Sequence, residues 1–239
     1  MNKKNLILIS STITFFETFL YETIKKLSFD FNVIIFSNLE NSKNKFLKYN
    51  VKIIHIPLRR NVSLFYDLIS LTKLFYYSLK IKNFSIISVT PKGGMIGSVI
   101  KIFFFRTFRI HIFTGQVWAN FKGTKKFFYK LIYKFIIYES DKILFDSTSQ
   151  IQFMKLNNID LKNAHLIGTG SIKGVNLNKF KFKIQMKKLM KKKYKLKEND
   201  LIIIFVGRIN EDKGILDLIS AFTKLKNLYP FLKLFIVGS

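Results

Sequence analysis

Two cations follow a short apolar run near the C-terminal end of the sequence, and their spacing could hold a phosphate. The run Leu201–Val206 is continuous and rich in β-branched residues, which is typical of a strand buried on both faces of a parallel sheet. Gly207 ends it, and from Ile215 the apolar residues recur at helical spacing. Arg208 and Lys213 therefore lie in a predicted strand–turn–helix unit, close to the start of the helix.

Such a position favours an anionic ligand. Ligands of open α/β sheets bind outside the carboxyl ends of the strands, and the N-terminus of a helix attracts phosphate. Arg208 offers a planar fork to two oxygens, and Lys213 adds a point charge. Each charge-assisted hydrogen bond of this kind contributes about 1.5–3 kcal/mol. Spacing alone leaves an equal alternative, in which a surface arginine and lysine flank an ordinary turn.

Residues 206–214 read V-G-R-x-x-x-x-K-G, which resembles the donor-site signature of glycosyltransferase family 4. That family consists of retaining enzymes of the GT-B architecture, in which two Rossmann-like domains face each other across a cleft. The resemblance implies that Gly207, Arg208 and Lys213 bind the diphosphate of a nucleotide sugar, which we expect to be UDP-linked. It implies neither a metal ion nor another cofactor.

Three further runs resemble turns found in a subset of the same family. They are T-P-K-x-G-x-x-G at residues 90–97, T-G-Q-V-W at 114–118 and D-S-x-S-Q at 146–150. The candidate residues of the acceptor side or the cleft are therefore Thr90, Lys92, Gly93, Thr114, Gln116 and Trp118.

The residue types of these runs leave alternatives open. Lys92 and its neighbouring glycines could hold an anion, although a glycine after a strand often marks only a turn. Gln116 and Trp118 could orient a sugar with an amide and an indole, although Trp118 could equally pack in the core. Many family members carry a histidine where Thr114 stands. The nearest histidine, His111, lies inside the strand, and we expect it to be a satisfied strand residue without a catalytic role.

Composition limits the possible partners and chemistry. The 239 residues carry a formal net charge of +27, which requires an anionic neighbour such as a membrane surface, nucleic acid or a phosphorylated ligand. The absence of cysteine excludes disulfides and thiolate sites, and three histidines make a histidine-rich metal site improbable. There is no P-loop, no nucleophile elbow and no zinc-protease motif. No signature of a nucleic-acid-binding fold is present, so we expect no nucleic-acid partner.

Two stretches concentrate the positive charge. Between Leu68 and Tyr138 there is no acidic residue. Within that stretch a lysine recurs every four residues, at Lys122, Lys126, Lys130 and Lys134. A helix is predicted from about Thr124 to Tyr138, and lysines at this spacing share one helix face. This pattern favours an amphipathic helix on an anionic membrane, with a solvated lysine face as the alternative. The second stretch, Lys181–Lys197, holds nine lysines and is predicted to be an interdomain linker or the opening helix of the next domain.

The alternation of strands and helices predicts a doubly wound parallel sheet. We expect strands around residues 6–9, 33–36, 51–56, 86–89, 110–113 and 142–145, with Thr90–Gly94 as a turn. The first strand is preferred over a signal peptide because Glu17 interrupts the apolar pattern. The expected domains are a Rossmann-like acceptor-side domain at 1–176, a basic linker at 177–198 and the start of a nucleotide-sugar domain at 199–239. This last domain would be truncated.

Together these features predict a glycosyltransferase that moves a sugar to an acceptor, which we expect to be a lipid-linked glycan in envelope polysaccharide assembly. The expected location is cytoplasmic, peripheral at the inner face of the plasma membrane. The alternative is a non-catalytic basic fragment of such an enzyme that binds membranes or polyanions.

Overall fold

The computed structural model describes residues 3–43, 45–59, 61 and 63–238. The chain divides into two compact units, Met1–Gly174 and Val175–Ser239, which we call the first and the second unit. The assignment of these units to the acceptor side and the donor side stays a prediction.

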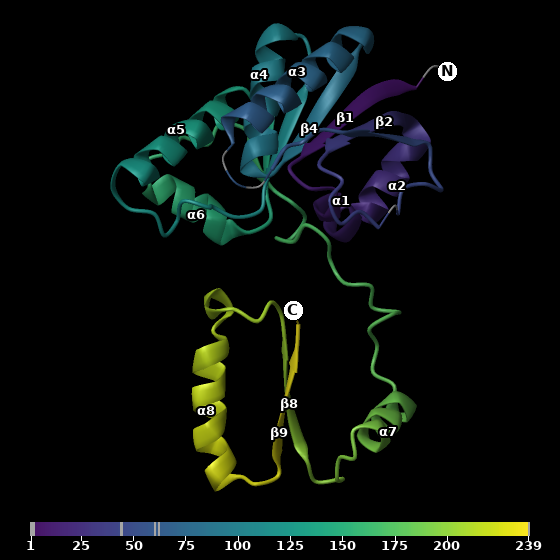
Figure 1. Ribbon diagram of the computed structural model, residues 1–239, viewed down its shortest axis with the longest axis vertical. Helices are drawn as coiled ribbons and strands as arrows, with labels where there is room; N and C mark the ends of the chain where they lie inside the picture. The colour runs from purple at the N-terminus through teal and green to yellow at the C-terminus, as the bar shows by residue number, and fades with distance from the viewer. Residues whose placement is uncertain (1–2, 44, 60, 62, 239) are drawn as a thin grey trace. The chain divides into compact units, whose positions relative to one another are not determined.

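The first unit is built on a parallel sheet, as the alternating pattern predicts, but the sheet has a seventh strand, Ala164–Leu166, in addition to the six expected ones (Figure 1). The spatial order of the strands is β3-β2-β1-β4-β5-β6-β7, so the chain winds outward from β1 in one direction and from β4 in the other. The strands are β1 (Lys4–Ser10), β2 (Phe31–Ser37), β3 (Val51–His55), β4 (Phe84–Val89), β5 (Arg109–Phe113), β6 (Lys142–Phe145) and β7 (Ala164–Leu166). β1 lies between β2 and β4 and pairs with both strands. Ile7, for example, lies opposite Ile34 on β2 and Ile86 on β4.

Helices cover both faces of this sheet. They are α1 (Ile13–Phe19), α2 (Tyr21–Asp30), α3 (Leu64–Lys80), α4 (Pro91–Phe103), α5 (Gly123–Tyr138) and α6 (Thr148–Leu156). Alternation along β1 sends Leu6 and Leu8 into the core beneath α1 and α2, and Ile7 and Ile9 into the core beneath α3 and α4. A third core joins α5 and α6 to β5 and β6.

The structure changes two of the predicted turns. The single helix expected after β1 is two helices, which meet at Leu20. The stretch Thr90–Gly94 is not an extended turn, because α4 begins at Pro91, a residue suited to the first helical position. The glycines there allow close packing: a Cβ on Gly93 would lie 2.9 Å from the Ile9 carbonyl oxygen.

The second unit contains one parallel strand pair and its helices. They are α7 (Ile184–Lys193), β8 (Leu201–Val206), a 3₁₀ turn (Glu211–Lys213), α8 (Ile215–Leu228) and β9 (Leu232–Val237). The strand predicted at 201–206 is present, but the prediction that it is buried on both faces is wrong, because none of its six residues is buried. Within the described residues β8 pairs only with β9, so the other edge of β8 stays open.

Of the helices formed by the described residues, none combines the length and the apolar character needed to cross a bilayer.

Candidate functional site

The carboxyl ends of β1 and β4 mark the place where the winding direction of the first unit reverses. β1 and β4 are neighbours at the middle of the sheet, and the chain leaves them toward opposite edges. In open α/β folds this switch point is where ligands bind, because the loops diverge and leave space above the strand ends. The candidate residues Thr90, Lys92 and Gly93 follow β4 at this point.

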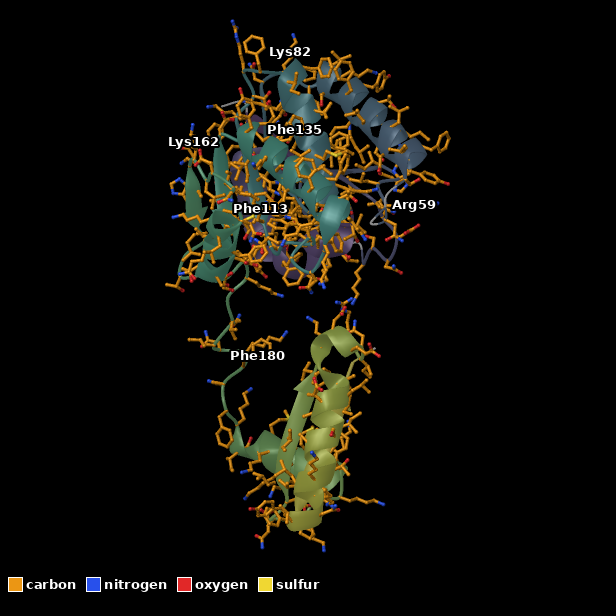
Figure 2. All side chains as sticks on the ribbon, turned by 90° about the vertical axis from the view of Figure 1, so that its left-hand side faces the viewer. Arg59, Lys82, Phe113, Phe135, Lys162 and Phe180 are labelled. Carbon is orange, nitrogen blue, oxygen red and sulfur yellow. The ribbon has the colours of Figure 1, made fainter. Side chains whose placement is uncertain are left out.

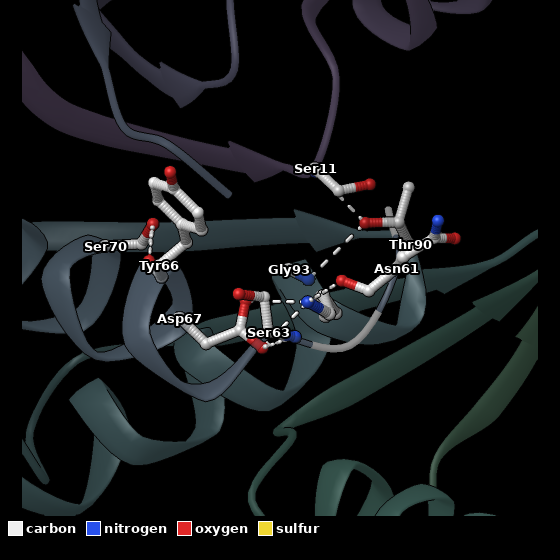
Figure 3. Close-up of polar contacts among 9 residues, drawn as sticks. Ser11, Asn61, Ser63, Tyr66, Asp67, Ser70, Thr90 and Gly93 are labelled. Carbon is white, nitrogen blue, oxygen red and sulfur yellow. Dashed lines mark hydrogen bonds and ion pairs between the residues drawn. The ribbon is translucent and has the colours of Figure 1, made fainter. Parts of the chain in front are cut away.

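Thr90 is held in an unusual backbone conformation at this switch point. Its φ of 64° and ψ of 149° are costly for a β-branched residue. Its hydroxyl oxygen accepts hydrogen bonds from the backbone N–H of Ser11, at 3.2 Å, and of Gly93, at 3.4 Å. Figure 3 shows these three residues meeting where β1 and β4 end. Thr90 thus joins the two central strands and caps α4, and strain of this kind is typical of functional sites.

Lys92 is paired with a carboxylate, and it is not a free cation. Its ammonium lies 2.6 and 2.7 Å from the two oxygens of Asp67 in the first turn of α3, and it also donates to the carbonyl of Asn61 at 2.6 Å. Both charged side chains are largely buried. The prediction that Lys92 holds an anion therefore needs correction, since its charge is already neutralised. The pair instead offers a donor and an acceptor side by side, which suits hydroxyl groups.

The ends of β5 and β6 are joined by an amide relay. Gln116 Nε2 donates to Gln150 Oε1 at 3.0 Å, and Gln150 Nε2 in turn donates to Asp146. The runs at 114–118 and 146–150 are thereby brought together, although the relay itself was not predicted. Burial raises the pKa of the Asp146 carboxyl above its usual value. Thr114, directly after β5, is exposed.

Trp118 lies in the core and does not line a site. Its side chain is fully buried, and its ring lies 5.8 Å from Tyr133 in an edge contact and 5.1 Å from Phe153. The hydroxyl of Tyr133 donates to the Gly115 carbonyl and accepts from the backbone N–H of Val117. Trp118 therefore fastens the loop after β5, and the prediction that its indole orients a sugar is wrong for this structure.

Sequence reasoning missed a buried arginine beneath the site. The guanidinium of Arg109 donates to the carbonyls of Gly94 and Ile136 at 2.7 and 3.1 Å. It also donates to the hydroxyls of Ser88 and Ser140 at 3.1 and 2.5 Å. Burial lowers the pKa of Arg109 to about 10, so it remains charged at neutral pH. The sequence contained only one sign of this role, namely that Arg109 is a basic residue beside the apolar residues of a predicted strand.

His111 lies beside this arginine in the same core. Its Nδ1 is 2.9 Å from the Ser88 hydroxyl, and the side chain is fully buried. Burial, and secondarily the charge of Arg109, lowers the pKa of His111 well below its usual value. The prediction of a satisfied strand histidine is confirmed. The imidazole ring also accounts for a glycine at position 94, because a Cβ atom there would lie 2.6 Å from the ring.

The loop after β8 presents the two cations of the second unit. Gly207 follows the strand, and both Arg208 and Lys213 are exposed. Neither forms an ion pair with any residue that the structure describes. Gly214, with a φ of 68°, occupies the left-handed region at the start of α8, where a side chain would be strained. Lys213 therefore lies two residues before Ile215, the first residue of α8, and so close to the helix start as predicted.

The described part of the chain holds no group of three or more His, Cys, Asp or Glu side chains placed to bind a metal. The candidate residues of the first unit provide hydroxyls, amides and one ion pair, which suit sugar hydroxyls. Those of the second unit are exposed cations, which suit phosphate oxygens.

Comparison with known proteins agrees with this chemistry. Residues 186–239 match the family described as "Glycosyl transferases group 1". The chain is 33% identical over 221 residues to the capsular polysaccharide biosynthesis glycosyltransferase CapM of Staphylococcus aureus. The match covers 91% of this chain and 56% of that protein, so the chain spans about half the length of its curated relative.

Solved structures share the fold. Sucrose-phosphate synthase from Thermosynechococcus elongatus matches with a TM-score of 0.73 at 16% identity, over 99% of this chain and 63% of that one. Anabaena Alr3699/HepE, crystallised with UDP and glucose, matches with a TM-score of 0.71 at 13% identity, over 98% and 61%. The fold of the chain is thus that of GT-B glycosyltransferases, and residues 186–239 are similar in sequence to the group 1 family.

Proposed function

We propose that the protein acts as a retaining glycosyltransferase of family 4. It moves a sugar from a UDP-linked donor to a lipid-linked glycan in envelope polysaccharide assembly. The observation that carries this proposal is the pair of exposed cations Arg208 and Lys213 after β8, which form no ion pair with the residues that the structure describes. They lie inside the segment that matches group 1 glycosyltransferases. The name of the relative CapM supports a polysaccharide product, and the UDP bound in Alr3699/HepE supports the nucleotide.

In this proposal the second unit holds the donor diphosphate. Negative charge develops on the diphosphate as the glycosidic bond to it breaks, and cations aimed at that charge lower the barrier. Arg208 binds two phosphate oxygens with its planar fork, while Lys213 supplies a mobile charge. Gly207 leaves the backbone open to close approach by the ligand. No metal ion or other cofactor is required for this role.

The first unit then offers the acceptor side. The switch-point residues Thr90 and Gly93 shape the backbone, and the Lys92–Asp67 pair presents a donor and an acceptor to sugar hydroxyls. Thr114 and Gln116 line the next strand end. Trp118 acts only by holding this loop in place.

The proposed location is cytoplasmic and peripheral at the inner face of the membrane, where a lipid-linked acceptor resides. The net charge of +27 supports an anionic neighbour of this kind. The alternative is a basic protein without catalysis that binds membranes or polyanions, and turnover of a UDP-sugar separates the two.

The test compares UDP binding by the full chain and by two variants. Arg208→Ala and Lys213→Ala should each weaken the affinity for UDP, measured by titration calorimetry, by roughly 10- to 100-fold, because each removes a charge-assisted bond. Lys224→Ala is the matched control, since Lys224 is exposed on α8 and the change alters net charge equally. Unchanged affinity in both site variants would exclude the proposed donor site.

A further inference from the structure

The helix α3 carries apolar residues on its outward side as well as on its inward side. The inward side has Leu74 in the core between Ser70 and Ser78, and all three residues are fully buried. The hydroxyl of Ser70 donates to the carbonyl of Tyr66 within the same helix. The outward side carries large apolar residues at helical spacing, and Phe65 is 69% exposed. The exposed apolar residues of this helix are Leu64, Phe65, Leu68, Ile69, Tyr76 and Leu79. A surface helix of a soluble protein normally has a polar outward side.

The helix α5 repeats this feature. Tyr133, Ile136 and Ile137 are buried against the sheet, yet the opposite side is also apolar. That outward side consists of Phe127, Phe128, Leu131 and Tyr138, with Tyr138 85% exposed. Of the four lysines predicted to share one face, Lys122 and Lys134 are exposed and Lys126 and Lys130 are half-buried. The exposed phenyl groups of Phe127 and Phe128 lie beside them and point away from the core.

The turn that follows α4 continues this apolar surface. The exposed residues Ile102 and Phe103 end α4, which packs against both α3 and α5, and the exposed Phe105 and Phe108 follow in the turn that leads to β5. In Figure 1 the three helices lie on the same side of the sheet, and Figure 2 looks onto α5, which bears Phe135. We call the exposed apolar residues of α3, α5 and this turn the aromatic face.

The charge around the aromatic face is mostly positive, and the acidic residues that border it in the sequence are Asp67 on α3 and Glu139 after α5. No acidic residue occurs between Leu68 and Tyr138. The cations on or beside the face are Lys73, Lys80, Lys82, Arg106, Lys125, Lys130 and Lys134. Many large apolar side chains exposed on neighbouring helices mark an interaction site. The cations around it require that the partner be anionic.

We propose that the aromatic face docks on an anionic lipid bilayer, with its rings inserted among the headgroups and its lysines paired with lipid phosphates. Aromatic and aliphatic side chains beside lysines are what interfacial binding requires. A second copy of the chain fits poorly, because an isologous contact would oppose rows of like charge.

This inference deepens the proposed function and rests on it for the choice of acceptor. The aromatic face begins beside the candidate acceptor site, since Leu68 directly follows Asp67, the partner of Lys92. Docking there would bring a lipid-linked glycan to the switch point while its lipid stays in the membrane.

The test is cosedimentation of the full chain with phosphatidylcholine vesicles, with and without phosphatidylglycerol. The α3 variant Phe65→Gln/Leu68→Gln/Tyr76→Gln and the α5 variant Phe127→Gln/Phe128→Gln/Leu131→Gln should each lower the partition to anionic vesicles by about tenfold or more, at low and high salt, because apolar insertion is lost. The variant Lys125→Gln/Lys130→Gln/Lys134→Gln should lower it only at low salt, because screening already weakens its contribution at high salt.

The control is Leu47→Gln/Leu156→Gln, which removes equally exposed apolar side chains outside the aromatic face. It should bind as the parent does. Fluorescence of the buried Trp118 verifies that every variant is folded. The inference is overturned if the parent does not bind anionic vesicles, or if the control variant loses as much vesicle binding as the α3 and α5 variants do. It is also overturned if the parent is a dimer and the α3 and α5 variants are monomers.

UDP affinity, measured on the same samples, keeps the two proposals apart. Vesicle binding without UDP binding would leave the docking face standing and remove the proposed donor site. UDP binding without vesicle binding would do the reverse.

Discussion

The strands β1 and β8 both contain a run of four aliphatic residues, Leu6–Ile9 and Leu201–Ile204, yet these runs have opposite environments. From Leu6 to Ser10 every residue of β1 is buried, whereas no residue of β8 is. β1 pairs with β2 and β4 and has helices on both faces, while β8 pairs only with β9 among the described residues. An aliphatic run therefore specifies a strand, but its burial is decided by the number of elements that pack around it.

Two arginines extend the comparison between the units. Arg109 in the first unit is fully buried and donates four hydrogen bonds to neutral groups. Arg208 in the second unit is exposed and has no ion-pair partner among the described residues. An arginine side chain thus holds neighbouring elements together in the first unit, whereas in the second unit an arginine side chain is available to a ligand. Four predictions test this contrast.

The largest effect is expected for Arg109→Ala. It leaves a cavity and removes hydrogen bonds that join β4, α4 and α5, so the free energy of unfolding should fall by about 4 kcal/mol. Urea unfolding followed by Trp118 fluorescence measures it, because the single tryptophan is buried in the first unit. The control is Arg106→Ala on the exposed turn, which should unfold as the parent does. A stable Arg109→Ala variant would break the distinction between the two arginines.

Substitutions in the two aliphatic strands come next. Ile7→Ala in β1 should lower the free energy of unfolding by about 3 kcal/mol, because Ile7 is fully buried. Ile203→Ala in β8 should lower it by less than about 1 kcal/mol, since Ile203 is only half-buried. Trp118 fluorescence follows the first unit and far-UV circular dichroism follows both. Equal losses would show that the open strand pair is packed as tightly as the sheet.

Acid should destabilise the first unit through His111. The folded chain keeps this ring neutral, because its pKa lies well below the usual 6.5. Below pH 6.5 the unfolded chain therefore binds the extra proton, and stability falls as pH drops, by at most about 1.4 kcal/mol per unit.

Urea unfolding at several pH values between 8 and 5, with His111→Gln as the control, checks this expectation. The variant should have a flatter profile, by about 2 kcal/mol over that range. All three histidines lie in the first unit. The free energy of unfolding of the second unit should therefore show no pH dependence that comes from histidine. An unchanged slope in His111→Gln would locate the acid sensitivity in other groups.

The smallest effect is expected for Arg208→Ala and Lys213→Ala in the absence of ligand. Both side chains are exposed, so the free energy of unfolding should change by no more than about 0.5 kcal/mol. Thermal unfolding with and without UDP measures it, and only the parent should gain stability from UDP. A large loss without ligand would mean that these cations hold the loop itself.

Most of the strands and helices can be predicted from the pattern of apolar and turn residues along short stretches of the sequence. The aliphatic runs predict the strands, and Gly207 and Gly214 bracket the loop that carries Arg208 and Lys213. The errors occur where one residue meets another far along the chain. Lys92 is neutralised by a carboxylate 25 positions away, and Gln116 bonds to an amide 34 positions away. Spacing within a motif contains no information about such partners.

The sequence by itself determined the order of strands and helices and the chemical character of the two cations after β8, because turn chemistry and periodicity act over a few residues. Only the tertiary structure decided that Trp118 and Arg109 are buried and that the phenyl side of α5 faces outward. Periodicity divides a helix into faces, but which face meets the sheet depends on what the rest of the chain places against it.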